Sequence, residues 1–118
     1  PMLKGIPGLG ALGDMAGMMK KAQEMQAKMA EMQDAMGRTV VVGEAGAGLV
    51  KARATAKGEV TGLDIDPSIL VASEKEVVED LIIAAIKDAQ AKGAMKMQDE
   101  MRRMTEALGL PADMKLPF

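Results

Sequence analysis

A glycine-rich segment at residues 43–48, with the sequence Gly-Glu-Ala-Gly-Ala-Gly, is the first feature that could bind a ligand. Glycines let main-chain amides approach an anion closely, which is how some loops cradle phosphate. The segment lacks the lysine and the serine or threonine of a nucleotide-binding P-loop, and a strand pattern rather than a helix pattern follows it. A hairpin turn that needs positive φ angles explains the same glycines more simply.

Asp64 and Asp66 form a second candidate site, because paired carboxylates can supply oxygen ligands to Mg²⁺ or Ca²⁺. No calcium-loop pattern surrounds them, and Asp66-Pro67-Ser68 is typical of a turn. Histidine and cysteine are absent from the sequence, so the commonest general base at neutral pH and the thiolate nucleophile are missing. We therefore expect a protein that is not an enzyme, with no metal, no cofactor and no small-molecule substrate.

Basic side chains in two predicted helices could neutralise the phosphates of a nucleic acid. The overall charge is -2, so only a local cluster could do this. A solvated helix surface explains these residues equally, although a two-fold axis in a dimer would double each cluster. The single aromatic residue offers no platform for stacking on unpaired bases, so contact with a duplex backbone is the expected mode. The candidate DNA-binding residues are Lys20, Lys21, Lys28, Lys96, Arg102 and Arg103.

The first helix is predicted over residues 14–36, where apolar residues recur at alternating spacings of three and four. This is the a/d pattern of a heptad repeat, with Asp14 expected to cap the start and Gly37 to stop the helix. The stripe could pack on its own domain or form a seam with a helix of a second subunit, and both interpretations stay open. The seam residues are Met15, Met18, Met25, Met29, Met32 and Met36, with Ala22 completing the repeat.

A three-stranded antiparallel meander is predicted after this helix. Strand-forming residues occupy 38–42, 49–56 and 59–65, and short connections join them. Alternation in the second strand places Val50 and the alanines that follow it on one face, opposite Lys51 and Arg53. A basic balance in 38–58 precedes an acidic balance in 59–72, so cross-strand pairing is expected to cancel much of the charge. The alternative is a basic sheet face that contacts phosphate.

A long final helix is predicted from Ser73 to Leu108. Ser73 and Glu76 have the spacing of a capping box, Gly93 is a possible weak point, and Gly109 and Pro111 end the helix. The expected fold class is therefore α+β: a helix, a three-stranded antiparallel meander and a long helix. Both helices are too long to be covered by so small a sheet, so they should protrude, which favours a homodimer.

The predicted organisation is a flexible glycine-rich arm at 1–13, a single domain at 14–110 and an irregular C-terminal tail at 111–118. No run approaches the roughly 20 apolar residues of a membrane-spanning helix. The N-terminus also lacks the compact apolar stretch of a secretory signal. We expect a cytoplasmic protein without a membrane partner.

The sequence resembles the YbaB/EbfC family over nearly its whole length, through five segments in matching order and spacing: residues 19–29, 43–51, 65–70, 79–89 and 114–118. The resemblance implies a tweezer-like homodimer with projecting helices that binds duplex DNA and is associated with the bacterial nucleoid. It also implies an influence on chromosome organisation and gene expression, with the basic residues of the helical arms as the DNA contacts. The alternative function is a protein–protein interaction module whose Met-rich arms grip a helix of another protein.

Overall fold

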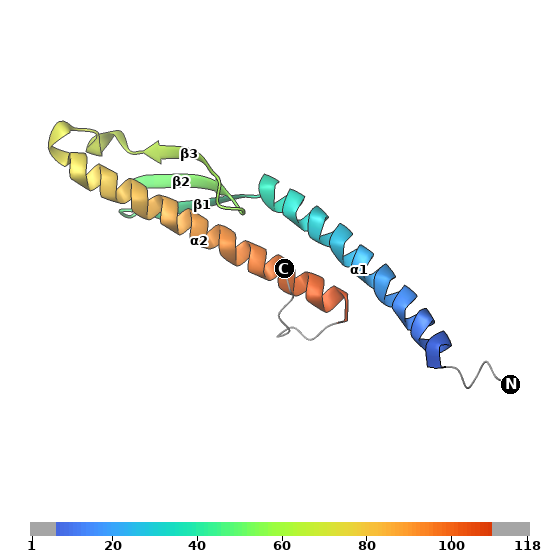
Figure 1. Ribbon diagram of the computed structural model, residues 1–118. Coiled ribbons are helices and arrows are strands. Elements are labelled where there is room, and N and C mark those ends of the chain that lie inside the picture. Colours follow the sequence, from blue (N-terminus) through green and yellow to red (C-terminus); the bar gives the residue numbers. More distant parts are fainter. Residues whose placement is uncertain (1–6, 110–118) are drawn as a thin grey trace. The chain divides into compact units, whose positions relative to one another are not determined.

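The computed structural model describes residues 7–109 and contains the predicted succession of helix, antiparallel meander and long helix (Figure 1). The chain divides into two compact units, residues 1–32 and 33–118, and the boundary falls inside the first helix. The elements are α1 (Pro7–Arg38), β1 (Val40–Ala45), β2 (Val50–Thr55), β3 (Val60–Ile65), the 3₁₀ helices η2 (Pro67–Ile69) and η3 (Ala72–Glu74), and α2 (Lys75–Ala107). The predicted α+β fold class is therefore confirmed.

Helix α1 is longer at both ends than the sequence pattern predicted. It begins at Pro7, so residues 7–13 of the expected glycine-rich arm are helical and Asp14 lies inside the helix rather than at its cap. Proline is well suited to a first helical turn because its φ is already helical and it has no N–H to satisfy. Gly37 does not stop the helix, which ends at Arg38, where the Thr39 N–H donates to Met36 O. Residues 1–6 of the predicted arm and the predicted tail at 111–118 lie outside the described residues.

The sheet is an antiparallel meander with β2 in the centre. The first turn is shorter than predicted, because Gly43 and the two residues after it belong to β1. The turn itself contains Gly46, Ala47 and Gly48, with φ of 63°, 55° and 89°. The Leu49 N–H closes it by donating to Gly46 O at 3.2 Å. The expectation of positive φ is thus confirmed for two of the glycines, whereas Gly43 is needed for another reason.

The core consists of small side chains between β2 and α2. Val50, Ala52 and Ala54 are fully buried on one face of β2, as the alternation predicted, and they pack with Ala85 and Ala89 of α2. Side chains this small let the helix approach the sheet closely. The buried apolar surface is correspondingly modest, so close contact between main chains has to contribute to cohesion.

Two glycines allow this close approach. A β-carbon on Gly43 would lie 2.7 Å from Ala89 Cα and closer still to Ala89 N and Ala85 O. A β-carbon on Gly93 would lie 2.9 Å from Ala56 O. Gly93 was expected to be a weak point of the last helix, but α2 is continuous through it. Its function is to admit the main chain of the sheet.

The start of α2 differs from the predicted capping box. The helix begins at Lys75 with Glu74 at the N-cap and no side-chain cap hydrogen bond, while Ser73 lies within η3. The 3₁₀ turn supplies local hydrogen bonds to this connection, since the Glu74 N–H donates to Val71 O at 2.9 Å. The predicted end is confirmed by Gly109, which has a φ of 75° and donates its N–H to Glu106 O.

Helix α2 is much longer than the strands it covers. Its 33 residues span about 50 Å, whereas six-residue strands span about 20 Å. Within the second unit, α2 packs along β1 and β2 and then continues past the sheet (Figure 1). The C-terminal part of α2 therefore protrudes from the sheet, as its length predicted.

The outer edge of β1 is covered by two side chains of α2. The Glu44 N–H donates to Asp88 Oδ2 at 2.9 Å, and Lys92 Nζ donates to Val42 O at 3.2 Å. Asp88 and Lys92 also form an ion pair at 2.9 Å. An unpaired strand edge invites pairing with another chain, and these contacts occupy two of the main-chain groups on that side of the sheet.

Replacement of Asp88 by asparagine is expected to lower the urea midpoint of unfolding at pH 7 modestly. The hydrogen bond from Glu44 N–H and then the one from Lys92 lower the pKa of Asp88 below its ordinary value of 3.8. A lowered folded-state pKa stabilises the protein above the unfolded pKa, and this stabilisation is lost as the pH falls through the folded pKa. The variant should therefore lose less stability than the native chain on titration below pH 4. Asp80→Asn, a change at another exposed carboxylate of α2, serves as the control; equal acid sensitivity of the Asp88 variant and the native chain would contradict this role.

Candidate nucleic-acid interface

The predicted DNA-binding lysines of α1 are exposed and free to bind. Lys20, Lys21 and Lys28, the α1 lysines, form no ion pair with any other described residue. Lys21 and Lys28 are two turns apart, about 10 Å along the helix, and both flank the Met seam. Glu24 is the only acidic residue between Lys20 and Lys28, so this part of α1 has a local positive charge. A duplex phosphate could bind here without displacing an intramolecular partner.

The predicted DNA-binding arginines of α2, unlike the α1 lysines, already form ion pairs with acidic residues. Arg102 pairs with Asp99, and Arg103 pairs with Glu100 at 2.8 Å. A shallow pocket of about 360 Å³ at this site is lined by both arginines and two acidic residues. Lys96 is exposed and forms no ion pair among the described residues. Phosphate contact by either arginine would have to replace a carboxylate partner, which reduces its net contribution.

These acidic partners could have been found from the sequence. Asp99 and Glu100 each lie three residues before an arginine, and residues at this spacing are neighbours on a helix surface. These carboxylates offset the positive charges of Arg102 and Arg103. The structure therefore separates the six predicted residues into four lysines without ion pairs and two arginines with them.

The sheet does not present a basic face. Arg53 of β2 forms an ion pair with Asp64 of β3, and Lys51 is opposite Glu44 on one side and Asp64 on the other. Cross-strand pairing of this kind is favourable, and the Arg53–Asp64 ion pair agrees with the expected pairing between the two segments at one position. The alternative of a basic sheet surface for phosphate is disfavoured by the same contacts.

The methionines of the Met seam are exposed toward the N-terminus of α1 and buried toward its C-terminus. Met15 and Met18 are 57% and 70% exposed, whereas Met32 and Met36 are 9% and 4% exposed. Met25 and Met29 are half-buried. The sequence left open whether the stripe packs on its own domain, and the burial differs along its length. Exposed methionines in a heptad pattern are typical of a helix surface that can pack against another helix.

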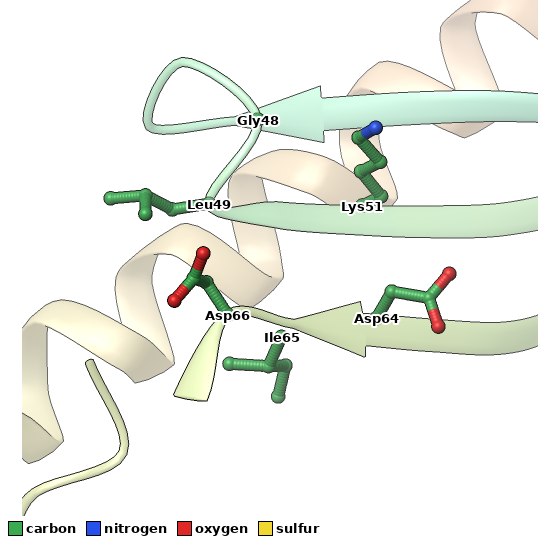
Figure 2. A pocket seen from close by; sticks show the side chains of 6 residues that line it. All are labelled: Gly48, Leu49, Lys51, Asp64, Ile65 and Asp66. Carbon is green, nitrogen blue, oxygen red and sulfur yellow. The ribbon is translucent and has the colours of Figure 1, made fainter. Parts of the chain in front are cut away.

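Neither of the other two candidate sites has the features of a ligand site. Figure 2 shows the shallow pocket of about 300 Å³ where Gly48, Lys51, Asp64 and Asp66 meet. Asp64 forms an ion pair with Arg53, and Asp66 accepts a hydrogen bond from Ser68 N–H at 2.9 Å. Hydrogen bonds from the Ser68 side chain and main chain lower the pKa of Asp66. Both carboxylates thus have structural partners, and the described residues contain no group of three or more potential metal ligands.

Within residues 7–109, neither long helix has an uncharged apolar stretch sufficient to cross a bilayer.

Comparisons with known proteins agree with this arrangement. The family model for the YbaB/EbfC DNA-binding family matches residues 12–108. A nucleoid-associated protein of Bradyrhizobium diazoefficiens, bll8115, is 49% identical over 85% of this chain and 94% of its own length. Another from Agrobacterium fabrum, Atu0095, is 48% identical over 89% of this chain and 98% of its own length.

A solved structure, the uncharacterized protein HP0035 of Helicobacter pylori, has the same fold. Its TM-score is 0.64 at 20% identity, and the match covers 74% of this chain and 91% of that one. At this identity the likeness concerns the fold alone. The family match and the two relatives cover most of the chain, so the chain belongs to the YbaB/EbfC DNA-binding family.

Proposed function

We propose that the chain binds duplex DNA as a homodimer and is associated with the bacterial nucleoid, with the α1 lysines as the main phosphate contacts. The observation that carries the proposal is that all three lysines are exposed and without ion pairs among the described residues. The family description supports DNA as the ligand, and the printed names of the relatives support association with the nucleoid. The proposal contains no catalytic step and no cofactor.

The exposed part of the Met seam supports the dimer. Met15 and Met18 are more than half exposed, although a heptad pattern places them on the face that packs against another helix. A second copy would cover this face with an identical flexible side-chain surface. Two-fold symmetry would then bring two sets of α1 lysines to one duplex and so create a cationic surface on a protein of net charge -2.

The phosphate-contact mechanism predicts steep salt dependence. If six lysines of a dimer each neutralise one phosphate, the slope of log K against log salt is about -5. Fluorescence anisotropy with two labelled duplexes of unrelated sequence, measured at several salt concentrations, gives this slope. Sedimentation equilibrium gives the mass. A dimer with similar, salt-sensitive affinity for both duplexes is the expected result, and a monomer that ignores duplex DNA at low salt would overturn it.

One specific observation favours a second candidate, the protein–protein interaction module. Met19 is 63% exposed beside the seam, so α1 presents a continuous flexible apolar surface that could grip a helix of another protein. Under this alternative, a stoichiometric partner would co-purify and duplex binding would be absent. Effects on chromosome organisation and gene expression belong to the DNA-binding proposal, because both require occupancy of the chromosome.

A further inference from the structure

Methionine is the residue of this chain that a mild oxidant would attack. The sequence contains 13 methionines but no cysteine, histidine, tryptophan or tyrosine, so no thiol is present to react first. Hydrogen peroxide transfers one oxygen atom to a methionine thioether, and the products are methionine sulfoxide and water. The sulfoxide side chain is polar, whereas the thioether is apolar. The position of each methionine therefore decides what oxidation changes.

Solvent exposure divides the methionines of the described residues. Peroxide must reach the sulfur from solvent, so an exposed thioether reacts faster than a buried one. Met32, Met36 and Met104 are buried. The methionines that are more than half exposed are Met15, Met18, Met19 and Met95. The folded chain is therefore expected to be oxidised at a few defined positions rather than at random.

Three of the exposed methionines lie together on α1. Met18 and Met19 are three and four residues after Met15, and residues at these spacings are neighbours on a helix surface. We call these three residues the thioether cluster. Met95 of α2 is equally exposed, at 64%, but it has no methionine three or four residues away. Two of the α1 lysines directly follow the thioether cluster in the sequence, so oxidation there changes the helix surface beside the proposed phosphate contacts.

Sulfoxides in the thioether cluster would oppose packing of the Met seam against another helix. Met15 and Met18 belong to the seam, and packing would withdraw their S=O groups from water. Burial of a polar group without a hydrogen-bond partner is unfavourable. Under the proposed function a second copy covers this surface, so oxidised chains would bring fewer α1 lysines to one duplex. Because the cluster is exposed in a single copy, oxidation takes place on the free subunit and disfavours its pairing.

We propose that the thioether cluster is a site of reversible oxidation by peroxides, and that sulfoxides at this site lower the affinity of the chain for duplex DNA. The site depends only on the exposure of the three thioethers, whereas the effect on DNA binding rests on the proposed function. Each step forms one S=O bond, breaks the O–O bond of the peroxide and releases water, while the sulfur loses two electrons. Methionine sulfoxide reductases convert the product back to the thioether. The α1 surface would thus respond to peroxide without any cysteine.

Peptide mapping by mass spectrometry, after timed exposure of the folded chain to hydrogen peroxide, tests the site. Trypsin cleaves after lysine and arginine, so the thioether cluster lies in a peptide of residues 5–20, and Met32 and Met36 lie in a peptide of residues 29–38. Fragment spectra assign each sulfoxide to its residue. The cluster should be oxidised at least about tenfold faster than Met32 and Met36, and in urea the rates should converge. Equal rates in the folded chain would overturn the site.

Duplex affinity before and after peroxide treatment tests the effect. The triple variant Met15→Leu, Met18→Leu, Met19→Leu cannot form sulfoxides in the cluster, and leucine is an apolar helix former of similar volume. The matched control is Met95→Leu, which removes one equally exposed thioether on α2. Each variant is compared with its own untreated sample by anisotropy. Peroxide should weaken duplex binding by the native chain and by Met95→Leu at least about tenfold, but not by the triple variant, and a sulfoxide reductase should restore it.

The outcomes separate this inference from the proposed function. If untreated native chain does not bind a duplex at low salt, the proposed function and the effect on DNA fail, while the peptide map still decides whether the cluster is an oxidation site. If the untreated chain binds and peroxide leaves its affinity unchanged, or weakens the triple variant equally, the inferred effect is overturned and DNA binding stands. Circular dichroism before and after treatment confirms that the chain remains folded.

Discussion

Gly43→Ala is expected to lower the free energy of unfolding by about 3 kcal/mol, at the upper end for overpacking. The added methyl group would meet main-chain atoms of Ala85 and Ala89, which cannot rotate away as a flexible side chain does. The helix would have to lift off β1, and the contacts of Val50 and Ala52 with α2 would loosen with it. In a domain of this size, the melting temperature should fall by more than about 10 °C. Far-UV circular dichroism measures this in a protein without tryptophan or tyrosine.

Gly17→Ala is the matched control for Gly43→Ala. A β-carbon at Gly17 would meet nothing within 4 Å, and alanine is favoured over glycine in a helix by about 1 kcal/mol. This variant should therefore melt at the same or a higher temperature. If the two substitutions have the same effect, the close approach of α2 to β1 is not what requires glycine at position 43.

The triple variant Lys20→Gln, Lys21→Gln, Lys28→Gln is expected to lose roughly 100-fold or more of its affinity for duplex DNA at low salt, and to do so for every duplex sequence. Each lysine that is removed eliminates one phosphate contact per subunit. The slope of log K against log salt should therefore become less negative by nearly one for each lost contact. Glutamine is a good helix former, so α1 should persist. Anisotropy titrations at several salt concentrations measure both quantities.

The control for this variant removes the same charge elsewhere. Lys51, Lys75 and Lys87 are also exposed, and none forms an ion pair among the described residues. Their replacement by glutamine changes the net charge of the chain equally. If this control weakens duplex binding as much as the α1 variant does, net charge rather than the position of the α1 lysines governs binding.

The order of elements could be predicted because it depends on hydrophobic periodicity, which is local in sequence. The three-and-four spacing of the methionines and the alternation in β2 each reflect one face of an element. The ends of the helices were less predictable, because a residue suited to capping can also lie inside a helix or in an adjoining turn. Asp14 and Ser73 both have good cap chemistry, yet α1 extends past the first and η3 includes the second.

The requirements at Gly43 and Gly93 could not be predicted, since they arise from contact between elements far apart in the chain. Gly43 precedes a turn rich in glycine, so its position in the sequence predicts a turn residue, whereas its requirement comes from a helix more than 40 residues later. The α1 lysines are predicted from residue type and position alone, and their contact with DNA stays a prediction. The ion pairs of Arg102 and Arg103 could be predicted from the spacing of acidic and basic residues along a helix. The ion pair of Arg53 could not, because it depends on the register between β2 and β3.

Asp88 and Lys92 also affect how readily the protein could aggregate. Sheet edges with unpaired main-chain groups can recruit further strands without end, and fibrils grow in this way. A strand added beside β1 would first have to displace Asp88 from Glu44 N–H and Lys92 from Val42 O. These two helix side chains would thus disfavour polymerisation from that edge.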